Sequence, residues 1–184
     1  MTNRFKILSK QEYRKGEYRI VPIRMEDRFK IMEWRNEQID LLRQKVVLTK
    51  KIQDEYFENV IVKLFDDEQP SQILFSFLKN KEFIGYGGLV HIDWEYKNAE
   101  ISFLLSTKMS SEKPYNILIN IFLELIEKVA KDVNLHKIYT YGYDVEDFRF
   151  KPLINQNYNL EATLKEHALI DDKFKDVKIY GKIL

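Results

Sequence analysis

Hydrophobic and polar positions in the first third of the chain switch from the period of a strand to the period of a helix. Residues 17 to 24, EYRIVPIR, alternate and predict a strand, with Pro22 marking an edge or a strand end. Residues 25 to 36 carry apolar side chains on one helical face. In residues 52 to 64, IQDEYFENVIVKL, apolar positions recur at steps of four, which predicts an amphipathic helix.

The middle of the chain predicts a strand hairpin, a third strand and a long helix. Residues 73 to 92 read as two strands joined by the polar KNKE of 79 to 82, after a turn at 66 to 72. A strand at 99 to 106 follows. The helix expected at 113 to 132 is apolar over most of its circumference, so we expect it to lie between two layers.

The last third predicts one strand, a short helix and a final hairpin. These occupy residues 137 to 144, about 147 to 157, and 160 to 183. Antiparallel neighbours followed by a strand-helix-strand crossover predict an α+β protein with a mixed, mostly antiparallel sheet and one parallel crossover. The length of 184 residues is typical of a single domain, here 1 to 184 with an N-terminal extension at 1 to 16.

Composition narrows the class of protein further. Apolar residues make up 45% and charged residues 32%, with no apolar run of membrane-spanning length and no signal-peptide core at the N-terminus. The absence of cysteine excludes disulfides, thiol nucleophiles and zinc–thiolate sites, and fits a cytoplasmic protein. Thirty basic and 29 acidic residues nearly cancel, which argues against a nucleic-acid partner. We expect no membrane partner, and either a monomer or a homodimer.

Several local strings, in this order and spacing, resemble the GCN5-related N-acetyltransferase (GNAT) superfamily. They are IVPIRMEDRFKIMEWRN near the start, FIGYGGLVHID, AEISFLL, NLHKIY, and LKEHALIDDKFKDVKIYGKI at the end. The resemblance covers about residues 17 to 184 and is strongest to the branch that acetylates ribosomal-protein N-termini and to amino-sugar acetyltransferases. It implies the acyl-CoA N-acyltransferase fold, with helices flanking the sheet and acetyl-CoA as cosubstrate.

The resemblance also implies where acetyl-CoA binds. In the family, two neighbouring strands splay apart and the pantetheine arm pairs with the backbone of one of them, which implies Phe103, Leu104 and Leu105 here. The pyrophosphate then meets the start of the following helix, in a loop with two glycines. In the best register Lys113 takes the first signature position and Asn116 the first glycine, with Leu118 at the second.

The break from 106 to 112 therefore departs from the family pattern. Unpaired N–H groups, the helix dipole, Lys113 and an Asn tolerant of left-handed geometry still favour an anion. Pro114 removes one donor, and Leu118 is expected to crowd a close phosphate. Either the cofactor site works without glycine or it is weakened. Ser110 and Ser111 are expected to cap the helix.

Acetyl transfer needs a base for the amine, and a carboxylate serves that purpose. The resemblance implies Glu100, in AEI, as the base; the plainer interpretation is a solvated carboxylate at a strand edge. The family's usual acid, a tyrosine, corresponds to Leu153 in KPLINQNY. Tyr143 is the replacement we select, with Tyr141 beside it. Both are also typical packing tyrosines.

Four candidate acceptor residues come from three places in the chain. Trp34 and Arg35 end the first helix, where family members shape the acceptor site, although Trp34 also suits packing. His91 ends a strand, and His167 lies in the last hairpin. The three histidines lack metal-ligand spacing, so we expect no metal. The GYGG at 85 to 88 precedes no helix and predicts a bulge or a close backbone approach.

The sequence thus predicts an acetyl-CoA-dependent N-acetyltransferase acting on a primary amine, either a peptide or protein N-terminus or a small molecule such as an amino sugar. The missing loop glycines and the missing tyrosine leave an alternative open. In that alternative the chain is a weakly active or inactive binding protein built on the same fold.

Overall fold

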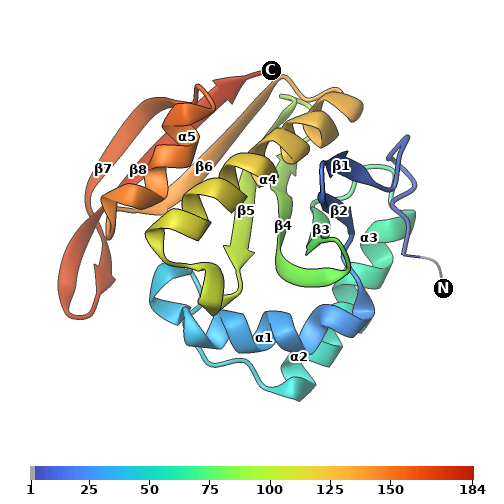
Figure 1. Ribbon diagram of the computed structural model, residues 1–184, viewed down its shortest axis with the longest axis horizontal. Helices are drawn as coiled ribbons and strands as arrows, with labels where there is room; N and C mark the ends of the chain where they lie inside the picture. Colours follow the sequence, from blue (N-terminus) through green and yellow to red (C-terminus); the bar gives the residue numbers. More distant parts are fainter. Residues whose placement is uncertain (1–2) are drawn as a thin grey trace.

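A computed structural model of the chain describes residues 3–184 and contains one eight-stranded sheet (Figure 1). The strand order is β1-β2-β3-β4-β5-β6-β8-β7. Every neighbouring pair is antiparallel except β5 and β6, which are parallel. The strands are β1 (Tyr13–Lys15), β2 (Tyr18–Pro22), β3 (Ile73–Lys79), β4 (Glu82–Asp93), β5 (Asn98–Leu105), β6 (Lys137–Tyr143), β7 (Asn159–Ile170) and β8 (Lys173–Ile183).

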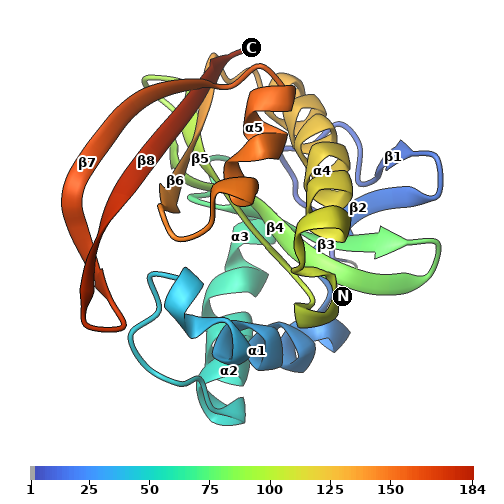
Figure 2. The ribbon, with the colours of Figure 1, turned by 60° about the vertical axis from the view of Figure 1, so that its left-hand side comes forward.

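Two groups of helices flank this sheet. The helices are α1 (Arg28–Glu37), α2 (Lys50–Tyr56), α3 (Val62–Asp66), α4 (Glu112–Asp132) and α5 (Lys151–Asn155). Figures 1 and 2 both show α4 and α5 side by side, and α1 and α2 together at the lower edge. Within residues 3–184, no helix is long and apolar enough to cross a membrane.

The α+β fold predicted from the sequence is confirmed, including the parallel crossover β5-α4-β6. Pro22 ends β2, as expected. The predicted helix at 52 to 64 is wrong in one respect, because a π-helical turn at Phe57–Ile61 separates α2 from α3. Periodicity does not distinguish the two geometries here, since Phe57 and Ile61 are buried in this turn as an amphipathic α-helix also requires.

The N-terminal segment joins the sheet and the core. Strand β1 pairs with β2, and Phe5 and Leu8 are buried in the main hydrophobic cluster. The segment is also tied to the last turn of α4, because Ser9 and Tyr13 donate hydrogen bonds to Asp132. Strand β1 was not predicted, because three residues are too few to show a period.

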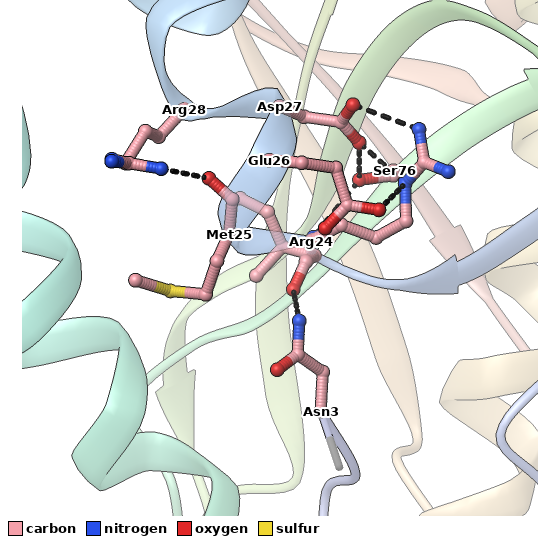
Figure 3. Close-up of polar contacts among 8 residues, drawn as sticks. Asn3, Arg24, Met25, Glu26, Asp27, Arg28 and Ser76 are labelled. Atoms are coloured by element: carbon pink, nitrogen blue, oxygen red, sulfur yellow. Dashed lines mark hydrogen bonds and ion pairs between the residues drawn. The ribbon is translucent and has the colours of Figure 1, made fainter. Parts of the chain in front are cut away.

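A buried network holds the start of the first helix against the sheet (Figure 3). Asp27 accepts two hydrogen bonds from the Arg24 guanidinium, at 2.7 and 2.8 Å, and one from Ser76 Oγ on β3 at 2.6 Å. A buried carboxylate needs this kind of pairing to offset its desolvation. The network fixes the direction in which α1 leaves the sheet, and α1 carries Trp34 and Arg35.

The glycines of β4 allow close contact with both neighbouring strands. A Cβ on Gly87 would lie 2.3 Å from the Ser102 carbonyl oxygen, and one on Gly88 would lie 2.0 Å from the Ile73 carbonyl oxygen. No side chain fits at these separations. The close backbone approach predicted for the GYGG stretch is therefore confirmed.

Candidate active site

The sheet opens where β5 and β6 diverge. The two strands pair only over Asn98 to Glu100 on β5 and Lys137 to Tyr139 on β6. Beyond Glu100, β5 remains paired with β4 on one side, and β6 remains paired with β8 on the other. The edge of β5 that faces β6 is therefore left without strand partners from Ile101 onward.

A cavity of about 430 Å³ occupies this opening. It is lined by residues of α1 and the connection after it, of the turn before β3, of β4, β5 and β6, and of α4, α5 and the segment before α5. The lining residues are Arg35, Leu41, Leu42, Arg43, Ser71, Gln72, Val90, His91, Glu100, Ile101, Ser102, Phe103, Leu104, Tyr115, Thr140, Tyr141, Gly142, Tyr143, Val145, Arg149, Phe150 and Leu153. Such a volume is typical of small-molecule sites.

Glu100 is a buried carboxylate in this cavity, with 5% of the residue exposed. Its Oε1 forms an ion pair with the guanidinium of Arg43. Its Oε2 lies 3.9 Å from Nε2 of His91, whose side chain is 64% exposed. Glu100 thus differs from the solvated strand-edge carboxylate of the plainer interpretation, and it has a neighbour that reaches solvent.

The backbone brings His91 to this position through an irregularity in β4. The β4–β5 register shifts between Val90 and Asp93, and His91 has a φ of 50°. A non-glycine residue in the left-handed region costs free energy, and such residues often occur at functional sites. A bulge changes the direction of a strand side chain.

Two tyrosines of β6 line the cavity near the same group of side chains. The Arg43 guanidinium lies 4.7 Å from the centre of the Tyr141 ring, and the Tyr143 ring meets the Tyr141 ring edge-on at 6.0 Å. Burial raises the pKa of the Tyr143 hydroxyl. Leu153, at the position of the family's usual acid, is buried and also lines the cavity.

The predicted cofactor residues fall into two groups. Phe103 and Leu104 line the cavity, and Leu105 is buried beside it. Lys113 is exposed in the first turn of α4, and Asn116 lies one turn further on with a buried Oδ1 that has no hydrogen-bond partner. Neither Lys113 nor Asn116 lines the cavity.

The start of α4 also answers three expectations about its local geometry. Asn116 is helical, so the left-handed conformation considered for it is not adopted. Leu118 is 6% exposed and belongs to the core cluster, so it leaves the helix start uncrowded. Ser111 is the N-cap residue without a side-chain capping bond, and Ser110 donates its hydroxyl to the Thr107 carbonyl instead.

The predicted acceptor residues are brought together only in part. Arg35 and His91 line the cavity. Trp34 is buried and stacks on Phe83 at 4.7 Å, away from the cavity lining. His167 lies on the exposed hairpin, 6.3 Å from the Tyr141 ring, outside the lining.

Three residues of the site were missed by sequence reasoning. Arg43 lies in an irregular connection, and Arg149 lies in a short 3-10 turn, so neither stands in a periodic pattern. Tyr115 is on α4 among apolar residues, and burial raises its pKa to about 12 although the nearby Arg149 lowers it. Their contacts join segments far apart in the chain. Within residues 3–184, no three His, Cys, Asp or Glu side chains converge as metal ligands would.

A mixed sheet whose parallel pair splays apart is the arrangement that the resemblance to the GNAT superfamily implies. The family model described as an acetyltransferase (GNAT) domain matches residues 20–142. The chain belongs to the GNAT acetyltransferase family. A comparison with curated proteins gave no match.

Solved structures show the same fold. Spermidine N-acetyltransferase from Vibrio cholerae, solved with CoA and spermine, has a TM-score of 0.77 at 17% identity, covering 92% of this chain and 96% of that chain. The ribosomal L7/L12 α-N-protein acetyltransferase RimL, solved with CoA, has a TM-score of 0.75 at 10% identity, covering 92% and 96%. The ribosomal-protein-S5-alanine acetyltransferase from Vibrio fischeri has a TM-score of 0.71 at 14% identity, covering 95% and 97%.

Proposed function

We propose that this protein transfers an acetyl group from acetyl-CoA to a primary amine, of a protein N-terminus or of a small molecule such as an amino sugar. One observation carries the proposal: the gap between β5 and β6 leads to the buried carboxylate of Glu100. Structural relatives solved with CoA, acting on spermidine or on ribosomal proteins, support a CoA thioester and an amine.

The chain offers suitable groups for acetyl-CoA, which supplies the acetyl group as a thioester. Backbone groups of β5 from Ile101 to Leu104 lack strand partners toward β6 and suit an amide-bearing arm. The side chain of Phe103 gives this part of the cavity an apolar wall.

Phosphates would be held near the start of α4. The first i→i−4 bond of the helix runs from the Tyr115 N–H to the Ser111 carbonyl, at 3.0 Å, so earlier N–H groups point outward without helical partners. Lys113 adds a charge. Arg149, which lines the cavity beside Tyr115, adds a second.

Glu100 is the proposed proton acceptor for the amine. Its burial removes competing water, and its Oε1 pairs with the guanidinium of Arg43. The proton that Glu100 accepts then needs a route out of the cavity. His91, 3.9 Å from Glu100 and mostly exposed, gives that route to solvent.

Tyr143 is the proposed proton donor to the leaving thiolate. Its hydroxyl is protonated at neutral pH, as the ordinary pKa of tyrosine near 10 requires, and burial raises that pKa further. Tyr115, on α4, also lines the cavity and is the second candidate for this role.

The competing function is a binding protein that keeps the fold without turnover. Two observations favour it: the break before α4 has no glycine, and Leu153 stands where the family has a tyrosine. The missing glycines count less against turnover because Leu118, at the position of the second glycine, lies in the core and does not crowd the start of α4.

Turnover separates the two functions. The purified protein is incubated with acetyl-CoA and a panel of N-terminal peptides, amino sugars and polyamines, and both thiol release and the acetylated product are measured. The proposal predicts amine-dependent thiol release with an acetylated product. Thiol release at the rate of the amine-free control for every amine would favour the binding protein.

A further inference from the structure

The charges that line the cavity are unequal. Three guanidinium groups, of Arg35, Arg43 and Arg149, face a single carboxylate, that of Glu100. Arg149 lies over the Tyr115 ring at 5.1 Å on the α4 side, and it pairs with Glu146 at 2.6 Å. We therefore assign it to the proposed phosphate-binding groups. Arg35 and Arg43 are then the two guanidinium groups left to meet the acceptor.

Arg35 is a half-buried cation with neutral partners. Its Nε donates to Gln44 Oε1 at 2.8 Å, and its Nη1 donates to the Tyr86 hydroxyl at 2.7 Å. Within residues 3–184, no carboxylate lies within ion-pair distance of it. A guanidinium has more donors than these two bonds use, so it is able to bind an anion in the cavity.

Arg43 is the chain neighbour of Gln44, which accepts the hydrogen bond from Arg35, and it is accessible. Its side chain is 46% exposed, and it bridges the Glu100 carboxylate and the face of the Tyr141 ring. Because it neutralises the only lining carboxylate, a second positive charge on an acceptor meets no unpaired anion in the cavity. This arrangement disfavours a polyamine.

We propose that the acceptor is an amine that also carries a carboxylate, bound by Arg35 and Arg43. The inference rests on the acetyl transfer proposed above and specifies its substrate class. Arg35 supplies an unpaired guanidinium, and Arg43 positions the carboxylate relative to Glu100. The carboxylate has two possible sources: an acidic side chain near a peptide N-terminus, or the carboxylate of a small amino acid.

Matched pairs of amines test this proposal. For the peptide source, Ser-Glu-Ala-Gly amide is compared with Ser-Gln-Ala-Gly amide; for the small-molecule source, alanine is compared with alaninamide. Spermidine is the cationic control. Binding is measured by calorimetry with CoA present, and kcat/KM is measured by thiol release. We expect the carboxylated member of at least one pair to bind at least about tenfold more tightly.

Variants then locate the preference. Arg35→Gln should reduce the preference for the carboxylated member to about threefold or less, and Arg35→Lys should restore it in part, because a lysine keeps the charge without the fork of donors. Arg14→Gln is the control, since Arg14 lies on β1 and pairs with Glu12. If Arg35→Gln does not fold, the matched pairs on the unaltered protein decide.

The outcomes distinguish this proposal from the proposed function. Equal binding within both pairs, no binding of either member, or tighter binding of spermidine would overturn the carboxylate proposal. Turnover without a carboxylate preference would leave acetyl transfer standing and this inference refuted. A carboxylate preference in binding without any turnover would support this inference and refute the proposed acetyl transfer.

Discussion

At the scale of the residue, the site is organised around Glu100. Among the described residues that line the cavity it is the only carboxylate, and its two oxygens meet different neighbours, Arg43 and His91. A buried carboxylate in an ion pair contributes little net stability by itself. Its position at the branch of β5 and β6 is therefore better explained by chemistry than by stability.

Replacement of Glu100 with glutamine should lower turnover about 10²-fold, because an amide accepts no proton from the amine. The affinity for CoA, measured by calorimetry, should change less than about threefold. Glu95→Gln is the matched control, since Glu95 is an exposed carboxylate in the turn before β5. Unchanged turnover in Glu100→Gln would remove Glu100 as the base.

Three tyrosines line the cavity, and their separate replacement identifies the proton donor. Tyr143→Phe should lower kcat about 10²-fold, whereas Tyr141→Phe and Tyr115→Phe should lower it less than about fivefold. Circular dichroism and the affinity for CoA serve as controls for folding. A larger loss of kcat in Tyr115→Phe than in Tyr143→Phe would identify Tyr115 as the proton donor.

Residue-level features were the hardest to predict from the sequence. Glu100 and Tyr143 were reached through a family resemblance, and His91 through its place at a strand end. Arg43 and Arg149 gave no signal, because each acquires its role only when a connection without periodicity folds over the sheet. For Trp34 the family resemblance was misleading. Its place at the end of the first helix suggested a contact with the acceptor, but its side chain stacks on Phe83.

At the scale of the element, the divergence of β5 and β6 creates the site, and α4 joins the two strands. Helix and strand periods predicted nearly all of these elements, because each buries a regular face. They did not predict where the two strands separate, since both strands keep their alternation through the branch. The π-helical turn and β1 were not predicted either. The turn shares the burial pattern of an α-helix, and β1 is too short to show a period.

The attachment of the N-terminal segment to α4 gives a pH-dependent prediction. Burial tends to raise the pKa of Asp132, but hydrogen bonds from Ser9 and Tyr13 outweigh it and lower that pKa below its ordinary value. The stabilisation is therefore present above the unfolded-state pKa near 4 and is lost as the pH falls further.

Asp132→Asn should lower the free energy of unfolding by about 1 to 2 kcal/mol at pH 7, because the bonds from Ser9 and Tyr13 lose their charged acceptor. Urea denaturation at pH 7 and at pH 3 measures the difference from the unaltered protein. The difference should shrink at pH 3. An equal difference at both values would show that the charge of Asp132 is not involved. Asp172→Asn, in the exposed turn between β7 and β8, is the control.

At the scale of the whole molecule, the sheet, the cavity and the family assignment agree on an acetyltransferase domain. The break before α4 departs from the loop expected for the family, because it contains no glycine. Its helix start retains unpaired N–H groups, Lys113 is exposed beside them, and Leu118 is turned into the core. These features are compatible with the proposed binding of acetyl-CoA without the loop glycines.

The most direct test is thermal unfolding of the protein with acetyl-CoA, CoA or ATP. A ligand that binds only the native state stabilises it by about 2.7 kcal/mol at 100 times its Kd, which corresponds to a rise in Tm of roughly 5 to 10 °C for a chain of this size. We predict such a rise with acetyl-CoA and CoA, and a much smaller one with ATP. An unchanged Tm at millimolar acetyl-CoA would contradict the account.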